Sequence, residues 1–466
     1  MKHLGRVVPS PEQLAIMSTN RLGTELIRGS AGSGKTTTAL LRLKSLTNFM
    51  KARKGREGNE DPVRVLLLTF NRTLAGYVRA LAEEQMLDPT HELEIATFAK
   101  WARDNLGEPN IDDSAARTYL RSLSEKFDTL ETDYLIQEVE YLLGRFEPDK
   151  LENYIGTERT GRGTLPRVGP ALRRRILDEV VYPYVHHLNS EGLLDWNGLA
   201  LDVRQKLSSL DYDIVVVDES QDFSANQLRA IRHHLAENHA IIFVIDTAQR
   251  IYARGFTWIE AGYEIAGNRS HRLGENHRNT RQIASFAAGL LDGMLVDVDG
   301  VLPDLNAAKT DGPLPQVLSG RYPLQLDWAI NYIRQHVDLE NETVAFLKPK
   351  AGKWFDFVRT RLKNEDIGFV DMTRRSEWPD GHENVAISTF HSAKGLEYDH
   401  VIILGFNQET TEFGEEEVSD QVRVLRSLLA VAVARARKQV IVGYKPGEES
   451  RLTQFFSDHT YEEISL

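Results

Sequence analysis

The chain has 466 residues, 27% of them charged and 41% hydrophobic, which is the composition of a globular protein of about two to four domains. Its net charge of −12, from 56 basic and 68 acidic side chains, argues against a basic footprint over the whole surface but allows a local one. The lack of cysteine excludes disulfides, iron–sulfur clusters and thiolate zinc sites, and no apolar run is long enough to span a membrane. Because the N-terminus has no signal-peptide pattern, we expect a cytoplasmic protein.

A phosphate-loop motif comes first along the chain. Residues 29–36 match G-x-x-x-x-G-K-[ST], between a strand expected at 24–28 and a helix expected at 37–46. The glycines let backbone N–H groups converge on phosphate oxygens at the positive end of the helix, with Lys35 on the β- and γ-phosphates and Thr36 on Mg²⁺. A glycine-rich turn that matches by chance is the alternative, but both flanking elements favour a nucleoside triphosphate site. The expected nucleotide-binding residues of this segment are Gly29, Ser30, Ala31, Gly32, Ser33, Gly34, Lys35, Thr36 and Thr37.

Strand-like and helix-like segments alternate on both sides of a helical middle. Short apolar runs rich in β-branched residues are typical of buried parallel strands. From about Phe98 to Gln205, amphipathic helices replace them. The pattern predicts an α/β fold with parallel sheets: one domain interrupted by a helical insertion, then a second domain. Further strands are expected at 63–69, 214–217, 240–245, 344–346, 385–388, 400–404 and 440–442, and further helices at 72–84, 134–143, 172–181, 225–235, 280–291 and 326–336.

An acidic pair ends the strand expected at 214–217. Asp218 would lie near Mg²⁺, usually through water, and Glu219 could polarise the attacking water. An acidic strand end that caps a helix is the alternative. Because a phosphate loop precedes it in the chain, we interpret the pair as the catalytic partner of that loop.

Further segments follow in an order that resembles the UvrD/Rep-like superfamily 1 helicases over nearly the whole chain. One such match is weak, whereas a full ordered set is specific. The segments that carry the resemblance, besides the two above, are Pro9–Gln13, Thr69–Ala75, Thr97-Phe98, Asp246–Tyr252, Asn276–Arg278, Thr389–Glu397 and Val431–Arg437.

The resemblance implies ATP and Mg²⁺ as cofactors and a cleft between two RecA-like P-loop domains. Gln13 stands where the family reads adenine, and Glu397 where it contacts the ribose. Gln249 would couple the γ-phosphate to the nucleic-acid groove. Arg278 and Arg435 would reach the γ-phosphate from the second domain as arginine fingers. The implied catalytic residues are Lys35, Asp218, Glu219, Gln249, Arg278 and Arg435, with Thr36 and Asp218 at the metal.

The resemblance also sets the expected domain bounds. Residues 1–97 and 206–270 form the first RecA-like domain, 98–205 the helical insertion and 271–466 the second RecA-like domain. The chain between Arg278 and Thr389 is only long enough for the second domain itself, so we expect no large accessory insertion there. Little chain follows Arg435, so no fused nuclease domain is expected.

A nucleic-acid track is expected along the same cleft. By resemblance, Phe70, Tyr252 and Trp258 are the aromatic candidates for base stacking, which is independent of sequence, although each alone is more often a core residue. Trp258 is the weakest, because the aromatic–arginine pair usual after Tyr252 is missing. The residues expected at nucleic acid are Phe70, Asn71, Thr97, Phe98, Tyr252, Trp258, Thr389 and His391.

Three positions depart from the family pattern without removing a catalytic group. Ile245 replaces a glycine, His277 replaces a tyrosine that stacks on adenine in relatives, and Ala434 replaces a threonine. Two charge clusters are also notable. The six arginines within 159–175 are either a nucleic-acid footprint or solvated surface, and the acidic run 415–417 is interpreted as solvated surface.

The sequence therefore predicts an ATP-dependent nucleic-acid motor, either a 3′-to-5′ DNA helicase or a single-strand translocase. Its expected partner is single-stranded or partly duplex DNA, with RNA left open. The alternative is a regulatory ATPase or nucleic-acid-sensing subunit of a larger complex, such as one with a partner nuclease in antiviral defence. A stand-alone P-loop kinase or switch has little support, since it would need neither Gln249 nor the two arginine fingers.

Overall fold

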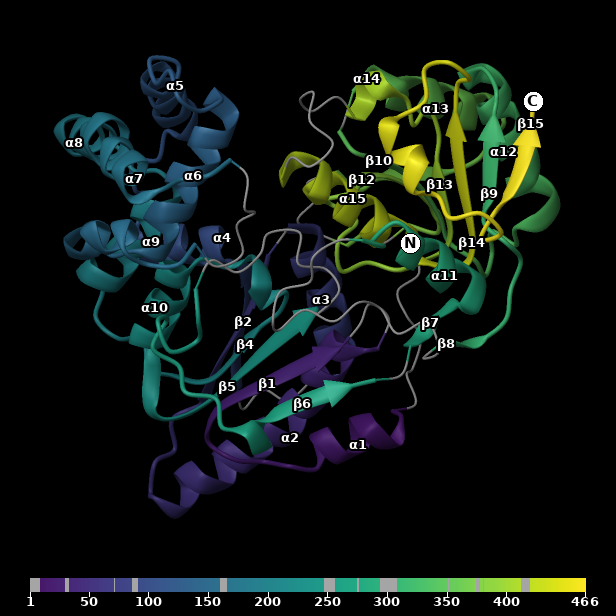
Figure 1. Cartoon of the computed structure of the whole chain (residues 1–466). Coiled ribbons are helices and arrows are strands. Elements are labelled where there is room, and N and C mark those ends of the chain that lie inside the picture. The colour runs from purple at the N-terminus through teal and green to yellow at the C-terminus, as the bar shows by residue number, and fades with distance from the viewer. Residues whose placement is uncertain are drawn as a thin grey trace.

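The computed structural model describes residues 9–29, 33–70, 72–85, 91–159, 166–246, 256–274, 276–293, 308–350, 352–373, 378–379, 381–411 and 420–466. They form two α/β domains, and a group of helices stands on the first domain, beside the second (Figure 1). This arrangement confirms the predicted fold class. Among the described helices, none has both the length and the apolar character needed to cross a bilayer.

The first domain is built on a parallel sheet. Within the described residues it has six strands in the order β3-β2-β4-β5-β1-β6. β6 pairs with β1, so this sheet includes residues beyond 270, the predicted boundary of the first domain. The strands are β1 (Gly23–Gly29), β2 (Val63–Thr69), β3 (His91–Thr97), β4 (Tyr212–Val217), β5 (Leu235–Asp246) and β6 (Ser270–Leu273).

Both faces of this sheet are covered by helices, which explains why its strands are apolar on both sides. Successive side chains of a strand point to opposite faces. Val65 and Leu67 accordingly pack with α2 (Lys35–Arg56) and α3 (Arg72–Gln85), whereas Leu66 and Leu68 pack with α4, α9 and α10. The remaining bounds are α4 (Phe98–Leu106), α9 (Trp196–Lys206) and α10 (Ala225–His233).

The helical insertion has a hydrophobic core of its own. α5 (Asp113–Ser124), α6 (Thr132–Arg145), α7 (Pro170–Ile176) and α8 (Tyr182–Glu191) bury their apolar faces against one another, while α4 and α9 pack on the first sheet. A π-helical turn, Leu177–Val181, joins α7 to α8 just before Pro183. Proline cannot donate to the preceding turn, and a π-turn is one way to accommodate it. The bounds 98–205 stay a prediction for this insertion.

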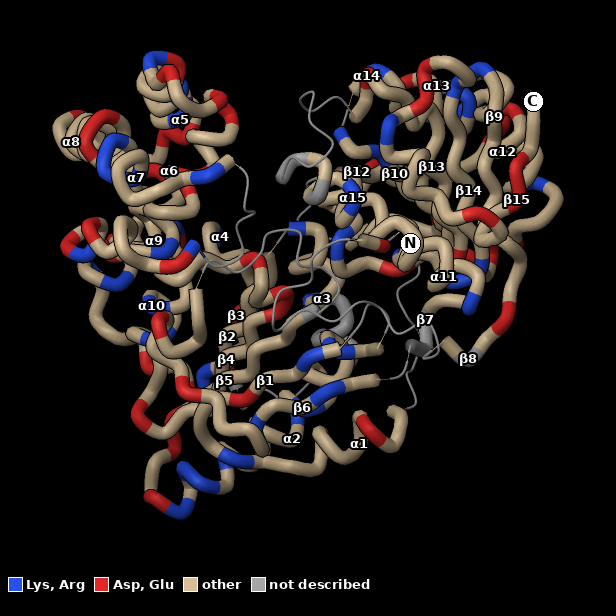
Figure 2. The backbone as a smooth tube through the Cα atoms, in the orientation of Figure 1, with Lys and Arg blue, Asp and Glu red and all other residues tan. Residues whose placement is uncertain are grey.

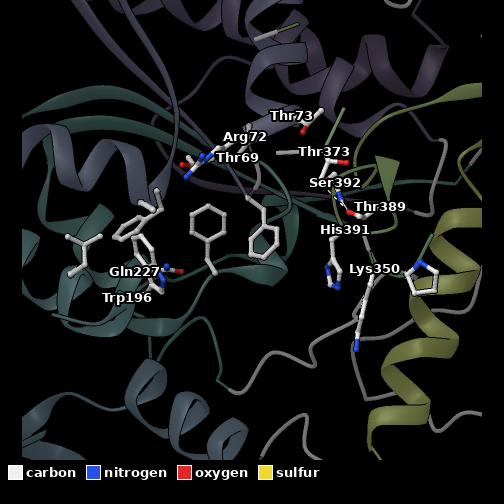
Figure 3. A pocket seen from close by; sticks show the side chains of 17 residues that line it. Thr69, Arg72, Thr73, Trp196, Gln227, Lys350, Thr373, Thr389, His391 and Ser392 are labelled. Carbon is white, nitrogen blue, oxygen red and sulfur yellow. Dashed lines mark hydrogen bonds between the residues drawn. The ribbon is translucent and has the colours of Figure 1, made fainter. Parts of the chain in front are cut away.

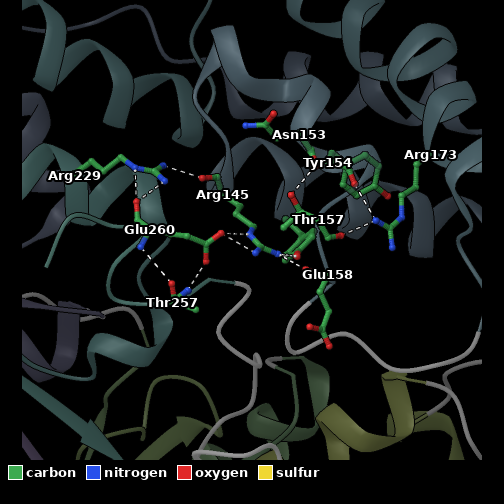
Figure 4. Close-up of polar contacts among 10 residues, drawn as sticks. Arg145, Asn153, Tyr154, Thr157, Glu158, Arg173, Arg229, Thr257 and Glu260 are labelled. Atoms are coloured by element: carbon green, nitrogen blue, oxygen red, sulfur yellow. Dashed lines mark hydrogen bonds and ion pairs between the residues drawn. The ribbon is translucent and has the colours of Figure 1, made fainter. Parts of the chain in front are cut away.

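The insertion is tied to the first domain by a polar network (Figure 4). Arg145 on α6 donates to a carboxylate oxygen of Glu260 at 2.8 Å. Arg229 on α10 donates to the backbone oxygens of Arg145 and Glu260, at 2.8 and 2.9 Å. Because one arginine comes from each side, the network fixes how the insertion stands on the sheet.

Most of the arginine run is engaged inside the insertion. Arg159 forms a buried pair with Glu138, and Arg173 donates to backbone oxygens of the 154–157 segment. Arg174 and Arg175 form surface ion pairs with acids of the same subdomain. Acidic and basic residues alternate over these helices (Figure 2). These contacts count against a nucleic-acid footprint: Arg174 and Arg175 belong to the solvated surface, whereas Arg159 and Arg173 hold the insertion together. Arg162 lies outside the described residues.

The second domain repeats the architecture. Its described strands form a seven-stranded parallel sheet in the order β11-β12-β10-β13-β14-β9-β15, with α12 (Tyr322–His336) and α13 (Lys353–Asn364) packed on one face. The strands are β9 (Gln316–Ser319), β10 (Val344–Lys348), β11 (Phe369–Asp371), β12 (Val385–Thr389), β13 (Tyr398–Ile403), β14 (Ala436–Tyr444) and β15 (Glu462–Ser465); β7 (Asn276–Thr280) and β8 (Ala308–Thr310) form a separate pair.

The two domains contact each other directly. Thr73 donates from Oγ1 to the backbone oxygen of Met372 at 3.2 Å, and the rings of Tyr77 and Trp378 lie 5.0 Å apart. Gly395 has a φ of +82°, and a Cβ there would come within 2.7 Å of Leu74. The chain at this point is thus held close against the first domain.

Candidate nucleotide site and nucleic-acid groove

The phosphate loop connects β1 to α2, as predicted. Gly34 is the N-cap of α2 in the left-handed conformation, with a φ of +75°, which glycine adopts at low cost. Lys35 is the first helical residue and is buried. Ser30, Ala31 and Gly32 lie outside the described residues. Because α2 begins directly after the loop, its positive N-terminal end lies where the motif predicts a phosphate group.

Gln13 supports this loop from α1 (Pro11–Met17). It is buried, and its Oε1 accepts from the Ser10 N–H at 2.9 Å in a capping box. Its Nε2 donates to the backbone oxygen of Ser33 at 3.3 Å. A Cβ on Gly34 would lie 2.3 Å from the same nitrogen, so a larger residue there would displace the amide group of the glutamine. Its expected role in reading adenine stays a prediction.

Thr36 and Asp218 meet at the carboxyl ends of the strands. Thr36 Oγ1 lies 2.9 and 3.1 Å from the two carboxylate oxygens of Asp218. Burial above all, and then the adjacent Glu219, raises the pKa of Asp218 above its usual range. A hydroxyl and a carboxylate are hard oxygen ligands that fit Mg²⁺, so the residues present match the implied metal.

Glu219 stands in a constrained turn directly after Asp218. Its φ of +51° is unusual for a residue with a side chain, and such outliers cluster at functional sites. Its backbone N–H donates to Asp218 Oδ1 at 3.0 Å, and its carboxylate accepts from Gln221. The following Ser220 donates to the backbone oxygen of Val244 on β5, at 3.0 Å. The turn is therefore tied to the neighbouring strand, and it fixes the direction of the carboxylate.

The arginine predicted to be a finger lies in the second domain. Arg435, after α15 (Asp420–Val433), is buried and donates to the backbone oxygen of Leu396 at 3.4 Å. Asn279 on β7 donates from Nδ2 to the carbonyl oxygens of Ala434 and Ala436, at 3.0 and 2.6 Å. Those are the two neighbours of Arg435, so β7 and the chain around Arg435 lie side by side.

Other nucleotide-site predictions can be placed only in part. The backbone of Arg278 belongs to β7, next to Asn279, but its side chain lies outside the described residues, as does Gln249. Glu397 is half-buried and immediately precedes β13. Thr37 lies in the first turn of α2.

A groove of about 960 Å³ runs between the two domains and the start of α9 (Figure 3). Phe70, 39% exposed, lies on the first wall, and His391 lies on the second. Thr97 and Phe98 also line the groove, although Phe98 is largely a core residue against Trp101 and Phe223. Its lining residues are Thr69, Phe70, Arg72, Thr73, Thr97, Phe98, Ala99, Trp196, Leu199, Phe223, Gln227, Pro349, Lys350, Thr373, Thr389, His391 and Ser392.

The structure does not bring every predicted contact into this groove. Trp258 packs on Phe243 and Tyr263, with ring centroids 4.4 and 6.4 Å away. It borders a separate pocket that also contains Gly23, the first residue of β1. Phe70 instead follows the carboxyl end of β2, at the opposite end of the parallel strands. The core interpretation of Trp258 is therefore favoured. Asn71 and Tyr252 lie outside the described residues.

Sequence reasoning missed several residues of the groove. Trp196, 38% exposed, begins α9 and lines it, and Lys350 lines it from the loop after β10. A second groove of about 550 Å³ shares Arg72 and Trp196 with the first and also contains basic residues of α3 and α4. One signal was available, because Arg72 and Arg79 are seven residues apart and lie on one helix face. The basic residues lining the second groove are Arg72, Arg79, Lys100 and Arg103, and its acids are Asp104 and Glu108.

Similarity to known proteins identifies the family of this chain. Residues 10–257 match the UvrD/REP helicase N-terminal domain, and residues 359–446 match the UvrD-like helicase C-terminal domain. A probable DNA helicase of Mycoplasma pneumoniae is 22% identical over 468 residues, covering 94% of this chain and 82% of that protein. The solved C-terminal domain of a possible DNA helicase from Lactobacillus plantarum is 21% identical and covers 40% of this chain and 97% of its own, with a TM-score of 0.30. The chain belongs to the UvrD/REP helicase family.

Proposed function

We propose that this protein is a motor that couples ATP hydrolysis to movement along single-stranded DNA, as a helicase or translocase. Membership in the UvrD/REP family implies ATP use, and the Mycoplasma relative is described as a probable DNA helicase. The 3′-to-5′ direction rests on the family resemblance alone. The observation that carries the proposal is that one segment, Thr389–Lys394, lines the groove at one end and meets the acids after β4 at the other.

The chemistry of the proposed site follows from its side chains. Lys35 and the N-terminus of α2 would hold the β- and γ-phosphates. Thr36 and Asp218 would hold Mg²⁺, which neutralises phosphate charge when bound. Glu219 would accept a proton from the attacking water, and its constrained turn presets the carboxylate for that task.

The two-domain cleft would turn hydrolysis into movement. Arg435, and Arg278 beside it, would contact the γ-phosphate from the second domain, so ATP would draw the domains together and hydrolysis would release them. If the two walls of the groove hold the strand in alternation, each cycle moves the protein along it. Stacking on Phe70 suits such a track, because every base has a π-face.

The decisive measurement is ATP hydrolysis by the purified chain with single-stranded DNA, with single-stranded RNA and with neither, at low and moderate salt. We expect strong stimulation by DNA that weakens as salt rises. Glu219→Gln serves as the control for contaminating ATPases. Stimulation by RNA alone would mean that RNA, and not DNA, is the track. No stimulation by either would overturn the motor and favour a regulatory subunit that needs a partner.

A further inference from the structure

Lys394 stands at the junction of the two proposed sites. It lies on the loop after β12 and is only 2% exposed. Its ammonium group pairs with the Asp222 carboxylate and lies 3.7 Å from Glu219 Oε2. The same nitrogen lies 5.5 Å from the centroid of the Phe70 ring. One cation of the second domain thus contacts the proposed base and the proposed stacking platform of the first.

The loop that carries Lys394 is held firmly at both ends. The Ala393 N–H donates to the Thr389 oxygen at 2.9 Å, and the Leu396 N–H donates to the Ala393 oxygen at 3.0 Å. Gly395 is pressed against Leu74 on α3, as described above. The segment from the groove lining at Thr389 to Lys394 is therefore a compact, internally bonded turn that also contacts the first domain.

The ammonium group is charged in its buried position. Burial alone would lower the pKa of Lys394, but Asp222 and Glu219 together raise it above its usual value. The Glu219 carboxylate also accepts from Gln221. In this arrangement the carboxylate proposed to take a proton from water already accepts a hydrogen bond from Gln221 and forms an ion pair with Lys394.

We infer that Lys394 is a positioning residue that makes ATP hydrolysis depend on the nucleic-acid strand. With the groove empty, its ammonium group restrains Glu219. A base stacked on Phe70 shifts the ring and the ammonium group with it, and Glu219 is then free to accept a proton from water. This inference rests on the proposed motor function and assigns its coupling to one side chain.

The test compares hydrolysis with and without saturating single-stranded DNA in the wild type and in Lys394→Met. We expect the variant to hydrolyse ATP faster than the wild type without DNA, with a ratio of stimulated to basal rate near unity and a similar KM for ATP. Lys394→Arg, which keeps the charge, should restore much of the stimulation. Lys350→Met is the matched control: it removes a lysine of the same groove and should weaken DNA binding while keeping the stimulation at saturation. A Lys394→Met ratio equal to that of the wild type would overturn the inference.

A second variant guards against misfolding, because Lys394→Met leaves the buried Asp222 without this counter-charge. Lys394→Met/Asp222→Asn removes both charges and should show the same loss of stimulation. A readout independent of turnover uses Phe70→Trp, whose emission should change when a non-hydrolysable ATP analogue binds, and should not change once Lys394→Met is added. If the double variant kept the emission change seen with Phe70→Trp alone, the link would be overturned. Lack of stimulation in the wild type would instead contradict the motor function itself.

Discussion

The two halves of the interdomain cleft are built in different ways. On the nucleotide side the functional groups are buried, charged and held by short contacts, as in Thr36 with Asp218 or the constrained turn at Glu219. On the groove side the lining residues are more exposed, and they include two aromatic rings, hydroxyl groups and few charges. Chemistry on a phosphate requires fixed groups, whereas a track for any sequence requires faces on which each base can stack. Changes in the first half should therefore affect turnover, and changes in the second should affect affinity, except at Phe70, which lies next to Lys394 and should affect both.

The largest effect is expected from Arg435→Ala. An arginine finger contributes on the order of 10³–10⁵ in turnover, and a loss of this size in kcat is expected. Arg437→Ala is the matched control, because this arginine lies two residues further on and is exposed on β14. The measurement is the hydrolysis rate at saturating ATP and DNA, with a thermal melt to check folding. A folded Arg435→Ala variant with the turnover of the control would remove Arg435 from the site.

Glu219→Gln comes next. Loss of a general base typically reduces the rate by about 10²–10⁴-fold, while the neutral amide keeps the shape of the side chain. We expect the variant to bind a fluorescent ATP analogue with affinity close to that of the wild type. Single-turnover hydrolysis at the wild-type rate would show that another group activates the water.

On the groove side, Trp196→Ala should weaken binding of single-stranded DNA while leaving kcat at saturating DNA nearly unchanged. Phe70→Ala should weaken binding and also lower the DNA-stimulated kcat, because Phe70 is the ring next to Lys394. Stacking contributes about 1–3 kcal/mol per base, or roughly 5- to 150-fold in the dissociation constant. Phe357→Ala is the control, since Phe357 is an exposed ring of α13 that does not line the groove.

Trp258→Ala tests whether Trp258 belongs to the hydrophobic core or to the nucleic-acid track. Because Trp258 packs on Phe243 and Tyr263, its loss should lower the free energy of unfolding by on the order of 2 kcal/mol or more without changing DNA affinity. Denaturant unfolding measures the stability of the variant, and fluorescence anisotropy measures its DNA affinity. A stable variant with weakened DNA binding would return Trp258 to the nucleic-acid track.

The same contrast explains how much the sequence could predict. The central strands of both sheets and the Thr36–Asp218 pair were predictable, because local patterns and a spaced motif specify them. The strands toward the sheet edges, β3, β6, β9, β11 and β15, were not predicted. Trp258 was predicted on the track by resemblance, and its position in the sequence does not reveal at which end of the strands it lies. Trp196 and Lys394 escaped notice because their neighbours come from distant parts of the chain; Lys394 and Asp222 are 172 residues apart. Only packing brings such residues together.

The smallest effect is expected from the arginine run, where the structure favours ion pairs within the insertion over a nucleic-acid footprint. Arg174→Ser/Arg175→Ser should leave DNA affinity and its salt dependence unchanged within about twofold, since exposed pairs with acids of the same subdomain contribute little. Arg72→Ser/Arg103→Ser, which removes two exposed arginines from the groove beside the track, should lower affinity. Each arginine that contacts a phosphate should also reduce the slope of log affinity against log salt by about one. The two double variants remove equal charge, so net charge alone predicts equal effects and position predicts unequal ones. A reduced slope in Arg174→Ser/Arg175→Ser would mean that the insertion contacts the phosphate backbone, and the track would then extend over its helices.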